Sequence, residues 1–279
     1  MRSARIGGAV ACAAWVAALF ASVPSARGTV VPPPSYITGE TPHRHLHFTF
    51  DDGPDPRTTP RLLEILDRAR VKATFFFSTS RFAGRQARNA GASDLAREIV
   101  RRGHTAGSHS FEHQRMGAMS ADAARAQIAR SEREFLQVMG VPTRWFRPPF
   151  GSRGPAVDRL LAEGGYTTVL WNIGMADWVA RPPEQLVVTF WRKIALNEET
   201  GVRGGIVLLH DTHDWSIDAF EQILSSIAER NCELVGRGEE PYDIVDSLDV
   251  FVVPPDATAQ RMRVAQVRER IAKSCGHGG

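Results

Sequence analysis

The chain has 279 residues, of which 43% are hydrophobic and 23% charged, and its formal net charge is +3. This is ordinary for a globular protein and long enough for one large core or two small ones. Without Arg2 and Arg5, which lie in a predicted leader, 32 basic residues face 31 acidic ones, a difference of +1. Such a balance gives no support to binding of nucleic acid or anionic membranes through overall charge.

The first 27 residues have the pattern of a secretory signal peptide. Arg2 and Arg5 precede an uncharged run over residues 7–23, and small or polar residues follow at 24–28. This order is typical of a leader removed on export. A retained membrane anchor is the alternative, although the run is short for a span. We therefore expect a chain that is secreted or lies in the periplasm or cell envelope, with no transmembrane segment in its mature form.

Residues 28–44 are rich in Pro, Ser and Thr and are predicted to form a linker between the leader and the folded domain. Two cysteines, Cys232 and Cys275, belong to the exported part. They could form a disulfide in an oxidising compartment, but spacing alone leaves their pairing open.

Beyond the linker, short β-type runs alternate with longer helical patterns. Strands are predicted at residues 45–50, 73–77, 105–108, 144–147, 167–173 and 205–210, with one or two more between 242 and 253. Helices are predicted at residues 59–69, 93–102, 120–139, 155–163, 183–196, 216–230 and 257–273.

This alternation predicts an α/β domain of parallel strands over residues 45–256, closed into a barrel or doubly wound. Residues 257–279 would add a terminal helix and tail. No Gly-rich phosphate loop follows the first strand, which argues against a nucleotide-binding fold.

Ionisable side chains gather where the predicted strands end. They are Asp51 and Asp52, His109 and His113, Arg147, Asp177, and His210. In a βα barrel these carboxyl ends share one face, and sites are built there. The adjacent carboxylates of Asp51 and Asp52 repel each other unless a strong positive charge, such as a metal ion, lies close to them.

The segment HSFEH places His109 and His113 four residues apart, which would put both imidazoles on one side of a helical turn. Two neutral imidazoles and a carboxylate commonly bind zinc or another divalent ion with positions open for water. The spacing alone does not distinguish such a site from two surface histidines.

Two further residues have both a functional and a structural interpretation. His210 closes an apolar strand, where it could cap the backbone or act as a general acid with a pKa near the operating pH. Arg147 lies in FRPPFG, and the two prolines would hold it rigidly; a surface ion pair is the alternative.

Taken in chain order, five motifs resemble those of the polysaccharide deacetylase family, a group of metal-dependent carbohydrate esterases. They are TFDDGP, HSFEH, RPPFG, the Asp177–Trp178 pair, and LLH, and the resemblance covers about residues 46–253. It implies a distorted (β/α) barrel with fewer than eight strands. It also implies hydrolysis of the N-acetyl group of N-acetylglucosamine-type glycans, either peptidoglycan or chitin oligomers. An O-deacetylase of the acetylxylan esterase kind and a non-catalytic glycan-binding wall protein are the alternatives.

The resemblance implies a role for each matching position. Asp51 would be the general base, with Arg147 orienting it and the ion activating the water. His210 would protonate the leaving amine, and Asp177 would set the tautomer of His210. The ion, zinc or alternatively cobalt, would be held by Asp52, His109 and His113.

The remaining matching positions would contact the acetyl group. Trp178 and Leu208 would line its pocket, and the backbone N–H of Phe150 would stabilise the oxyanion. The chain departs from the family pattern at Gly174, three residues before Asp177, where an acidic residue is common. This departure bears on how Arg147 is braced.

Overall fold

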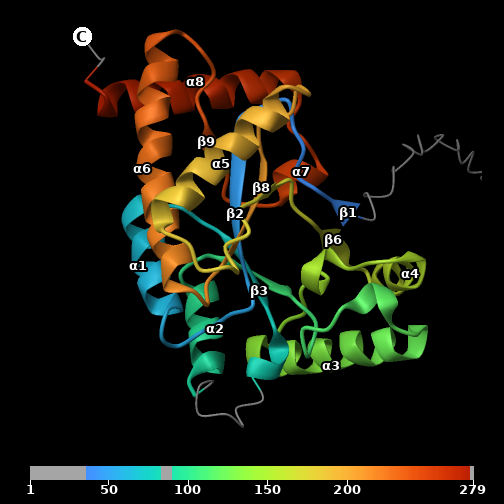
Figure 1. Ribbon diagram of the computed structural model, residues 1–279. Helices are drawn as coiled ribbons and strands as arrows, with labels where there is room; N and C mark the ends of the chain where they lie inside the picture. The colour runs from blue at the N-terminus through green and yellow to red at the C-terminus, as the bar shows by residue number, and fades with distance from the viewer. Residues whose placement is uncertain (1–35, 83–89, 277–279) are drawn as a thin grey trace, which may run out of the picture. The chain divides into compact units, whose positions relative to one another are not determined.

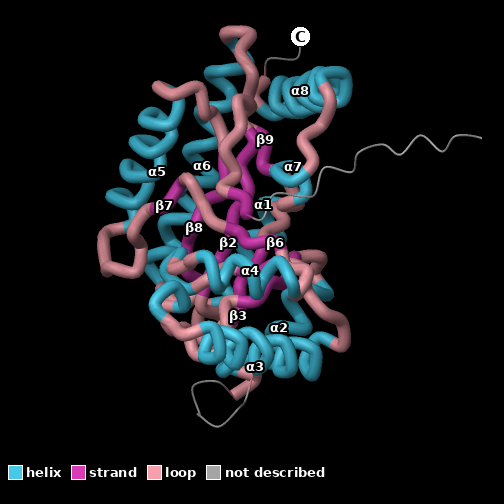
Figure 2. The backbone as a smooth tube through the Cα atoms, turned by 90° about the vertical axis from the view of Figure 1, so that its right-hand side faces the viewer, coloured by secondary structure: helices cyan, strands magenta, loops and turns pink. Residues whose placement is uncertain are grey.

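The computed structural model of the protein describes residues 36–82 and 90–276 (Figure 1). The predicted leader and the first part of the predicted linker lie outside these residues. Strands occupy the centre, and helices surround them (Figure 2). In the described part of the chain, no helix combines the length and the apolar character needed to cross a membrane.

The strands form one sheet whose neighbouring strands are parallel. Their bounds are β1 Tyr36–Ile37, β2 His45–Asp51, β3 Thr74–Phe77, β4 Thr105–Ser108, β5 Trp145–Phe146, β6 Thr167–Val169, β7 Ile173–Gly174, β8 Gly205–His210 and β9 Asp243–Ile244. Within the described residues the order is β1-β6-β5-β4-β3-β2-β8-β7, and β9 pairs with β2.

The helices follow the strands in alternation. Their bounds are α1 Thr59–Ala69, α2 Ala92–Arg101, α3 Ala121–Met139, α4 Pro155–Glu163, α5 Pro183–Glu198, α6 Asp214–Gly236, α7 Asp249–Val252 and α8 Ala257–Ser274. The predicted fold class, an α/β distorted barrel, is confirmed. The expected count of fewer than eight strands is wrong. The described sheet has nine strands, because the two-residue segments β1 and β7 also pair in it.

Local sequence explains the central elements. All seven residues of β2 are buried, as expected for a strand with parallel neighbours on both sides. Helix α1 has a proline in its first turn, where a backbone N–H would have no partner within the helix, so the proline costs no hydrogen bond. The helix buries Leu62 and Leu63. Edge-to-face contacts of Phe220 with Phe48 and Phe50 fix α6 against the sheet. Strand pairing of β2 with β8, and of β3 with both β2 and β4, holds the carboxyl ends of β2, β4 and β8 in one sheet.

The predicted single strand at residues 167–173 is wrong. The chain forms β6, leaves the sheet for three residues, and re-enters as β7 on the far side of β8. Asn172 causes the break: its side chain donates to Gly204 O and accepts from Ile206 N, both at 3.0 Å, where a neighbouring backbone would otherwise pair. Gly205 permits this approach, because a Cβ there would overlap the Asn172 amide.

Of the one or two strands expected between residues 242 and 253, one is present as β9, and Asp249–Val252 form the short helix α7. Asp249 is bound by Arg144 and by Ser247, which favours a helical turn there. Residues 36–37 of the predicted linker pair with β6 as β1, because the buried Ile37 packs beside Val169.

The C-terminal helix α8 crosses the end of α6 (Figure 1). Cys232 of α6 and Cys275, just after α8, form a disulfide across a sequence separation of 43 residues. The pairing that the sequence left open is therefore present, and it fixes the end of α8 against α6.

Candidate active site

Three side chains converge at the carboxyl ends of two strands of the barrel. Asp52 follows β2, and His109 and His113 follow β4. One ligand atom from each lies within 4.8 Å of the others. Asp52 Oδ1 is 3.0 Å from His113 Nε2 and 3.6 Å from His109 Nε2. Among residues 36–82 and 90–276, these form the single group of three or more such side chains with the spacing to hold a metal ion.

The predicted helical turn between the two histidines is wrong, although their rings do meet at 5.0 Å between centroids. The chain forms an irregular loop there, with left-handed φ values of 64° at Ser110 and 57° at His113. Ser110 Oγ accepts a hydrogen bond from the His113 backbone N–H at 3.2 Å. Asp52 is also left-handed, with φ of 75°. Such conformations are disfavoured for residues with a Cβ and gather at functional sites.

His109 is oriented by a hydrogen bond behind it. Its Nδ1 lies 2.7 Å from Arg147 O, and because a carbonyl can only accept, Nδ1 carries the proton and Nε2 presents a lone pair toward Asp52. Burial lowers the pKa of His109 despite the neighbouring carboxylates, so the imidazole stays neutral, as a metal ligand requires. Burial would raise the pKa of Asp52, but the neighbouring His113, His109 and His210 hold it well below its usual range.

These donors fit a divalent ion. Asp52 Oδ1 is buried without a well-formed hydrogen bond, which is costly for a carboxylate unless a cation satisfies it. One carboxylate and two imidazoles match zinc or cobalt with coordination positions left open for other ligands.

Arg147 lies inside the barrel and is fully buried. It donates to Asp51 Oδ1 at 2.7 Å and to Thr49 Oγ1 at 2.8 Å. On the opposite side it donates to Val169 O at 3.1 Å and to Leu170 O at 3.2 Å. Burial lowers the pKa of Arg147, and the charge and hydrogen bond of Asp51 oppose this. Thr49 and two carbonyls thus brace the guanidinium, while the position of the missing acid, Gly174, is covered by the Trp171 indole.

On the other side of the site, Asp177 binds His210 twice. Its Oδ1 lies 2.9 Å from His210 Nδ1, and its Oδ2 accepts from the His210 backbone N–H at 2.8 Å. Ser216 Oγ and Trp215 Nε1 donate to Oδ2 and to the backbone carbonyl of Asp177, respectively. Burial would lower the pKa of His210, but the hydrogen bond and charge of Asp177 outweigh it and raise the pKa to about 9.

This elevated pKa predicts a pH-dependent stability. A histidine whose pKa rises from 6.5 in the unfolded chain to about 9 in the folded protein contributes stability that is complete below pH 6.5 and is lost as the pH passes 9. In metal-free protein we expect this contribution to be about 3 kcal/mol. Urea unfolding of the unaltered protein and of His210→Gln at pH 6 to 10 measures it as the difference between the two curves. Parallel curves would contradict the expectation.

A pocket of about 400 Å³ opens over these groups. Its lining consists of Asp51, Asp52, His109, His113, Arg115, Phe150, Trp171, Trp178, Leu208 and His210. All the predicted site residues lie here except Arg147 and Asp177, which support Asp51 and His210 from behind. The exposed Trp178 ring stands edge-on to His210 at 6.0 Å. Phe150 adopts a left-handed φ of 60° and lies 4.6 Å from the His113 ring.

Arg115 and Trp171 were not predicted from the sequence. Trp171 lies in the apolar run TTVLWNI, which is typical of a buried strand, and only the exit of the chain after β6 brings it to the pocket. Arg115 follows His113 by two residues in a polar loop with no recognisable motif. Its nearness to HSFEH was the one available signal.

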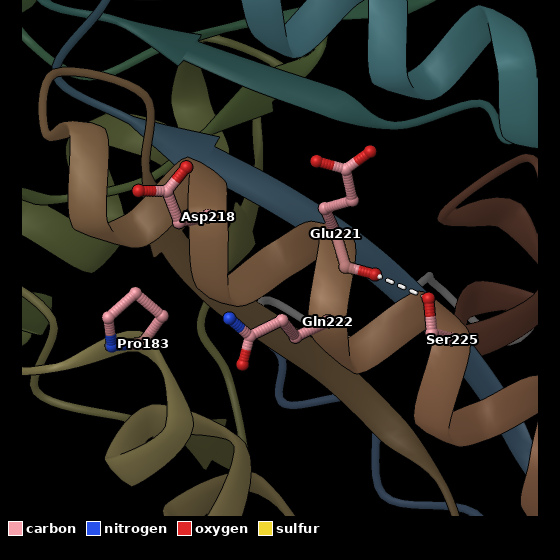
Figure 3. Close-up of a pocket in the computed structure, with 5 residues that line it drawn as sticks. All are labelled: Pro183, Asp218, Glu221, Gln222 and Ser225. Carbon is pink, nitrogen blue, oxygen red and sulfur yellow. Dashed lines mark hydrogen bonds between the residues drawn. The ribbon is translucent and has the colours of Figure 1, made fainter.

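Another depression, of about 310 Å³, lies between the start of α5 and the face of α6 (Figure 3). Its acidic residues already have partners: Asp218 pairs with Arg61, and Glu221 pairs with Arg68 at 2.8 Å. The pocket at the strand ends differs from this depression because its ionisable side chains converge on one point.

The sequence matches the family model described as polysaccharide deacetylase over residues 38–169. A peptidoglycan-N-acetylglucosamine deacetylase of Bacillus cereus is 31% identical over 214 residues, which cover 74% of this chain and 93% of that protein. The chain belongs to the polysaccharide deacetylase family. The resemblance drawn from the five motifs is therefore confirmed.

Solved structures of polysaccharide deacetylases share the fold. The chitin deacetylase of the fungal pathogen Colletotrichum lindemuthianum matches with a TM-score of 0.60 and 27% identity, over 70% of this chain and 86% of that one. A pseudoenzyme of the CE4 family from Bacillus anthracis matches with a TM-score of 0.61 and 28% identity, over 71% and 65%. Because structures with this fold include a pseudoenzyme, activity in a polysaccharide deacetylase has to be argued from the site itself.

Proposed function

We propose that this chain is an exported, metal-dependent deacetylase that hydrolyses the N-acetyl group of N-acetylglucosamine-type glycans of the cell wall. The observation that carries the proposal is the arrangement around one pocket. The triad of Asp52, His109 and His113 lines the same pocket as two further groups. These are a carboxylate bound by Arg147 and an imidazole bound by Asp177. Amide hydrolysis needs a base for water, stabilisation of an oxyanion and an acid for the leaving nitrogen, and this set offers all three.

In this proposal Asp52, His109 and His113 would hold the ion. When bound, a divalent ion supplies Lewis acidity, which lowers the pKa of water and polarises a carbonyl. Asp51 would take the proton from the water that adds to the acetyl carbonyl, and the Phe150 N–H would donate to the oxyanion. His210, protonated below its pKa of about 9, would give its proton to nitrogen as the carbon–nitrogen bond breaks. The products are acetate and a free amine.

The environment of each catalytic group suits its task. Arg147 donates to Asp51 Oδ1 at 2.7 Å, and its guanidinium charge offsets the repulsion between the Asp51 and Asp52 carboxylates. Asp177 accepts from His210 Nδ1, which leaves Nε2 as the proton donor toward the pocket. Trp178 and Leu208 provide apolar walls for a methyl group. Asp51 and His210 end the paired strands β2 and β8, and groups placed on hydrogen-bonded strands favour catalysis without rearrangement.

Export is supported by the leader-like residues 1–27 and by the disulfide, which forms in oxidising compartments. The relative from Bacillus cereus is named for action on peptidoglycan, a cell-wall polymer. The proposed location is therefore outside the cytoplasmic membrane.

The decisive experiment is mass spectrometry of glycans after incubation with the purified protein. Chitin oligomers, peptidoglycan fragments and acetylxylan should be tested in parallel, with the position of any lost acetyl group assigned. Loss from the 2-amino position supports the proposal, whereas loss from acetylxylan alone would indicate an O-deacetylase. Binding to these glycans with no acetate released from any of them would indicate a non-catalytic wall protein.

Removal of the metal should abolish acetate release, and zinc or cobalt should restore it. The expectation follows from the buried, unsatisfied Asp52 oxygen and the two imidazoles beside it, which cannot polarise a carbonyl without a cation. Initial rates after dialysis against a chelator, with metal content determined by elemental mass spectrometry, measure the effect. Full activity in the metal-stripped sample would rule this mechanism out.

A further inference from the structure

Arg115 lies at the mouth of the pocket and is held in place by an aromatic ring. It follows His113 by two residues and precedes the short 3-10 helix Met116–Ala118. Its guanidinium carbon is 4.2 Å from the centre of the Phe150 ring, and that ring lies 4.6 Å from His113. This cation–π contact orients an exposed side chain at low entropic cost. A positive charge is thereby fixed beside the proposed metal ligands.

Arg115 has no carboxylate partner among the described residues, unlike the arginines around it. Arg130 pairs with Glu112 at 3.4 Å, and Arg153 pairs with Asp158 at 2.7 Å. Glu112, the acidic residue closest to Arg115 in the sequence, also accepts from Gln127 at 2.9 Å. The ring of Phe150 covers only one face of the Arg115 guanidinium. Its N–H donors therefore stay available at the pocket edge.

The acidic groups of the pocket are already engaged as well. Asp51 is bound by Arg147, and Asp52 faces His109 and His113. Arg115 consequently brings a positive charge that makes no ion pair with any carboxylate of the described residues. A planar guanidinium matches a carboxylate in a two-point hydrogen-bonded pair.

We propose that Arg115 is a specificity-determining residue that binds a carboxylate on the glycan next to the sugar being deacetylated. The inference rests on the proposed function of the same pocket. It assigns the substrate class: anionic glycans, in which a sugar carries a lactyl carboxylate or a carboxylate-bearing peptide, are preferred over uncharged N-acetylglucosamine polymers such as chitin.

The test measures binding without turnover. In an Asp51→Asn background, calorimetry gives the Kd of three probes of equal sugar length. They are a neutral N-acetylglucosamine oligomer, an oligomer alternating with N-acetylmuramic acid whose lactyl carboxylate is free, and the same oligomer carrying peptides. Adding Arg115→Gln should raise the Kd of an anionic probe about fivefold relative to the neutral probe. If Arg115 binds the lactyl carboxylate, the substitution raises the Kd of the peptide-free anionic probe. If Arg115 binds a peptide carboxylate, the substitution raises only the Kd of the probe that carries peptides.

Matched variants separate charge from packing. Arg115→Lys keeps the charge but loses the two-point geometry, and it should fall between the unaltered residue and Arg115→Gln. Arg125→Gln removes an arginine that is exposed on α3 and paired with Asp122, and it should leave the ratio of Kd values unchanged. The effect of Arg115→Gln on the ratio of the anionic-probe Kd to the neutral-probe Kd should also shrink at high salt, because exposed ion pairs are screened.

An equal change in the Kd of neutral and anionic probes, or no change in either, would overturn the assignment of Arg115. Failure of the proposed function gives a different result. In that case the unaltered protein would release no acetate from any glycan, while the ratio of Kd values would still report on Arg115.

Discussion

Replacing Asp51 by Asn should lower the rate of acetate release by about three orders of magnitude. The amide has nearly the shape of the carboxylate, and its oxygen can still accept from Arg147, but it cannot take a proton from water. The proposed metal ligands Asp52, His109 and His113 are untouched, so metal should still bind. Initial rates on a glycan identified as a substrate, together with metal content after dialysis, measure the two effects separately.

A matched control for Asp51→Asn is Asp122→Asn. Asp122 is exposed in the first turn of α3 and pairs with Arg125, so this variant should keep the unaltered rate. A rate for Asp51→Asn within tenfold of the unaltered protein would contradict the proposed role of Asp51 as base. Loss of metal together with activity would instead place Asp51 among the ligands.

Replacing Arg147 by Met should lower the free energy of unfolding by about 3–5 kcal/mol, because it leaves the buried Asp51 carboxylate without its cation. The substitution also removes donors to Thr49 Oγ1, Val169 O and Leu170 O. Urea unfolding of metal-free protein at neutral pH measures the loss, and the absence of metal keeps ligand binding out of the comparison.

The double variant Asp51→Asn with Arg147→Met tests the reason for that loss. Because the buried charge is then absent, its destabilisation should be smaller than the sum of the two single changes. Arg147→Lys should be intermediate, since it keeps a charge but cannot reach all four acceptors. A loss below about 1 kcal/mol for Arg147→Met would mean that water or rearranged neighbours satisfy Asp51, contrary to the expected burial penalty.

The sequence predicted those elements whose hydrophobic pattern is uninterrupted. The predicted bounds of α1, β4, α4 and β8 coincide with those in the structure, because their apolar spacing and their Gly or Pro boundaries act locally. The apolar run at residues 167–173 was wrongly predicted to be one strand. Its break depends on hydrogen bonds of the Asn172 side chain to Gly204 and Ile206, which are 32 and 34 residues away in the sequence. A side chain that takes the place of a backbone partner in this way leaves no pattern in the local sequence.

The candidate site was predictable to a similar extent. Ordered motifs were sufficient to pick out Asp51, Asp52 and the two histidines, since their residue types carry the chemistry. The geometry of the loop was not predictable, because positive φ at Ser110 and His113 overrides the helical spacing that i, i+4 suggests. Trp171 and Arg115 were missed for a related reason: an aromatic residue in an apolar run and an arginine in a polar loop are common everywhere.

The position of Arg147 has a consequence for how sequences of this family can diverge. The same side chain ties β2 to the segment that crosses from β6 to β7 and orients the proposed base, so architecture and chemistry depend on one residue. We expect lineages that abandon hydrolysis to lose Asp51 or His210 early, while arginine persists at position 147 because its loss would loosen the barrel. When an inactive member is sought by inspection, the retained arginine would then be uninformative, and the acid–base pair would be diagnostic.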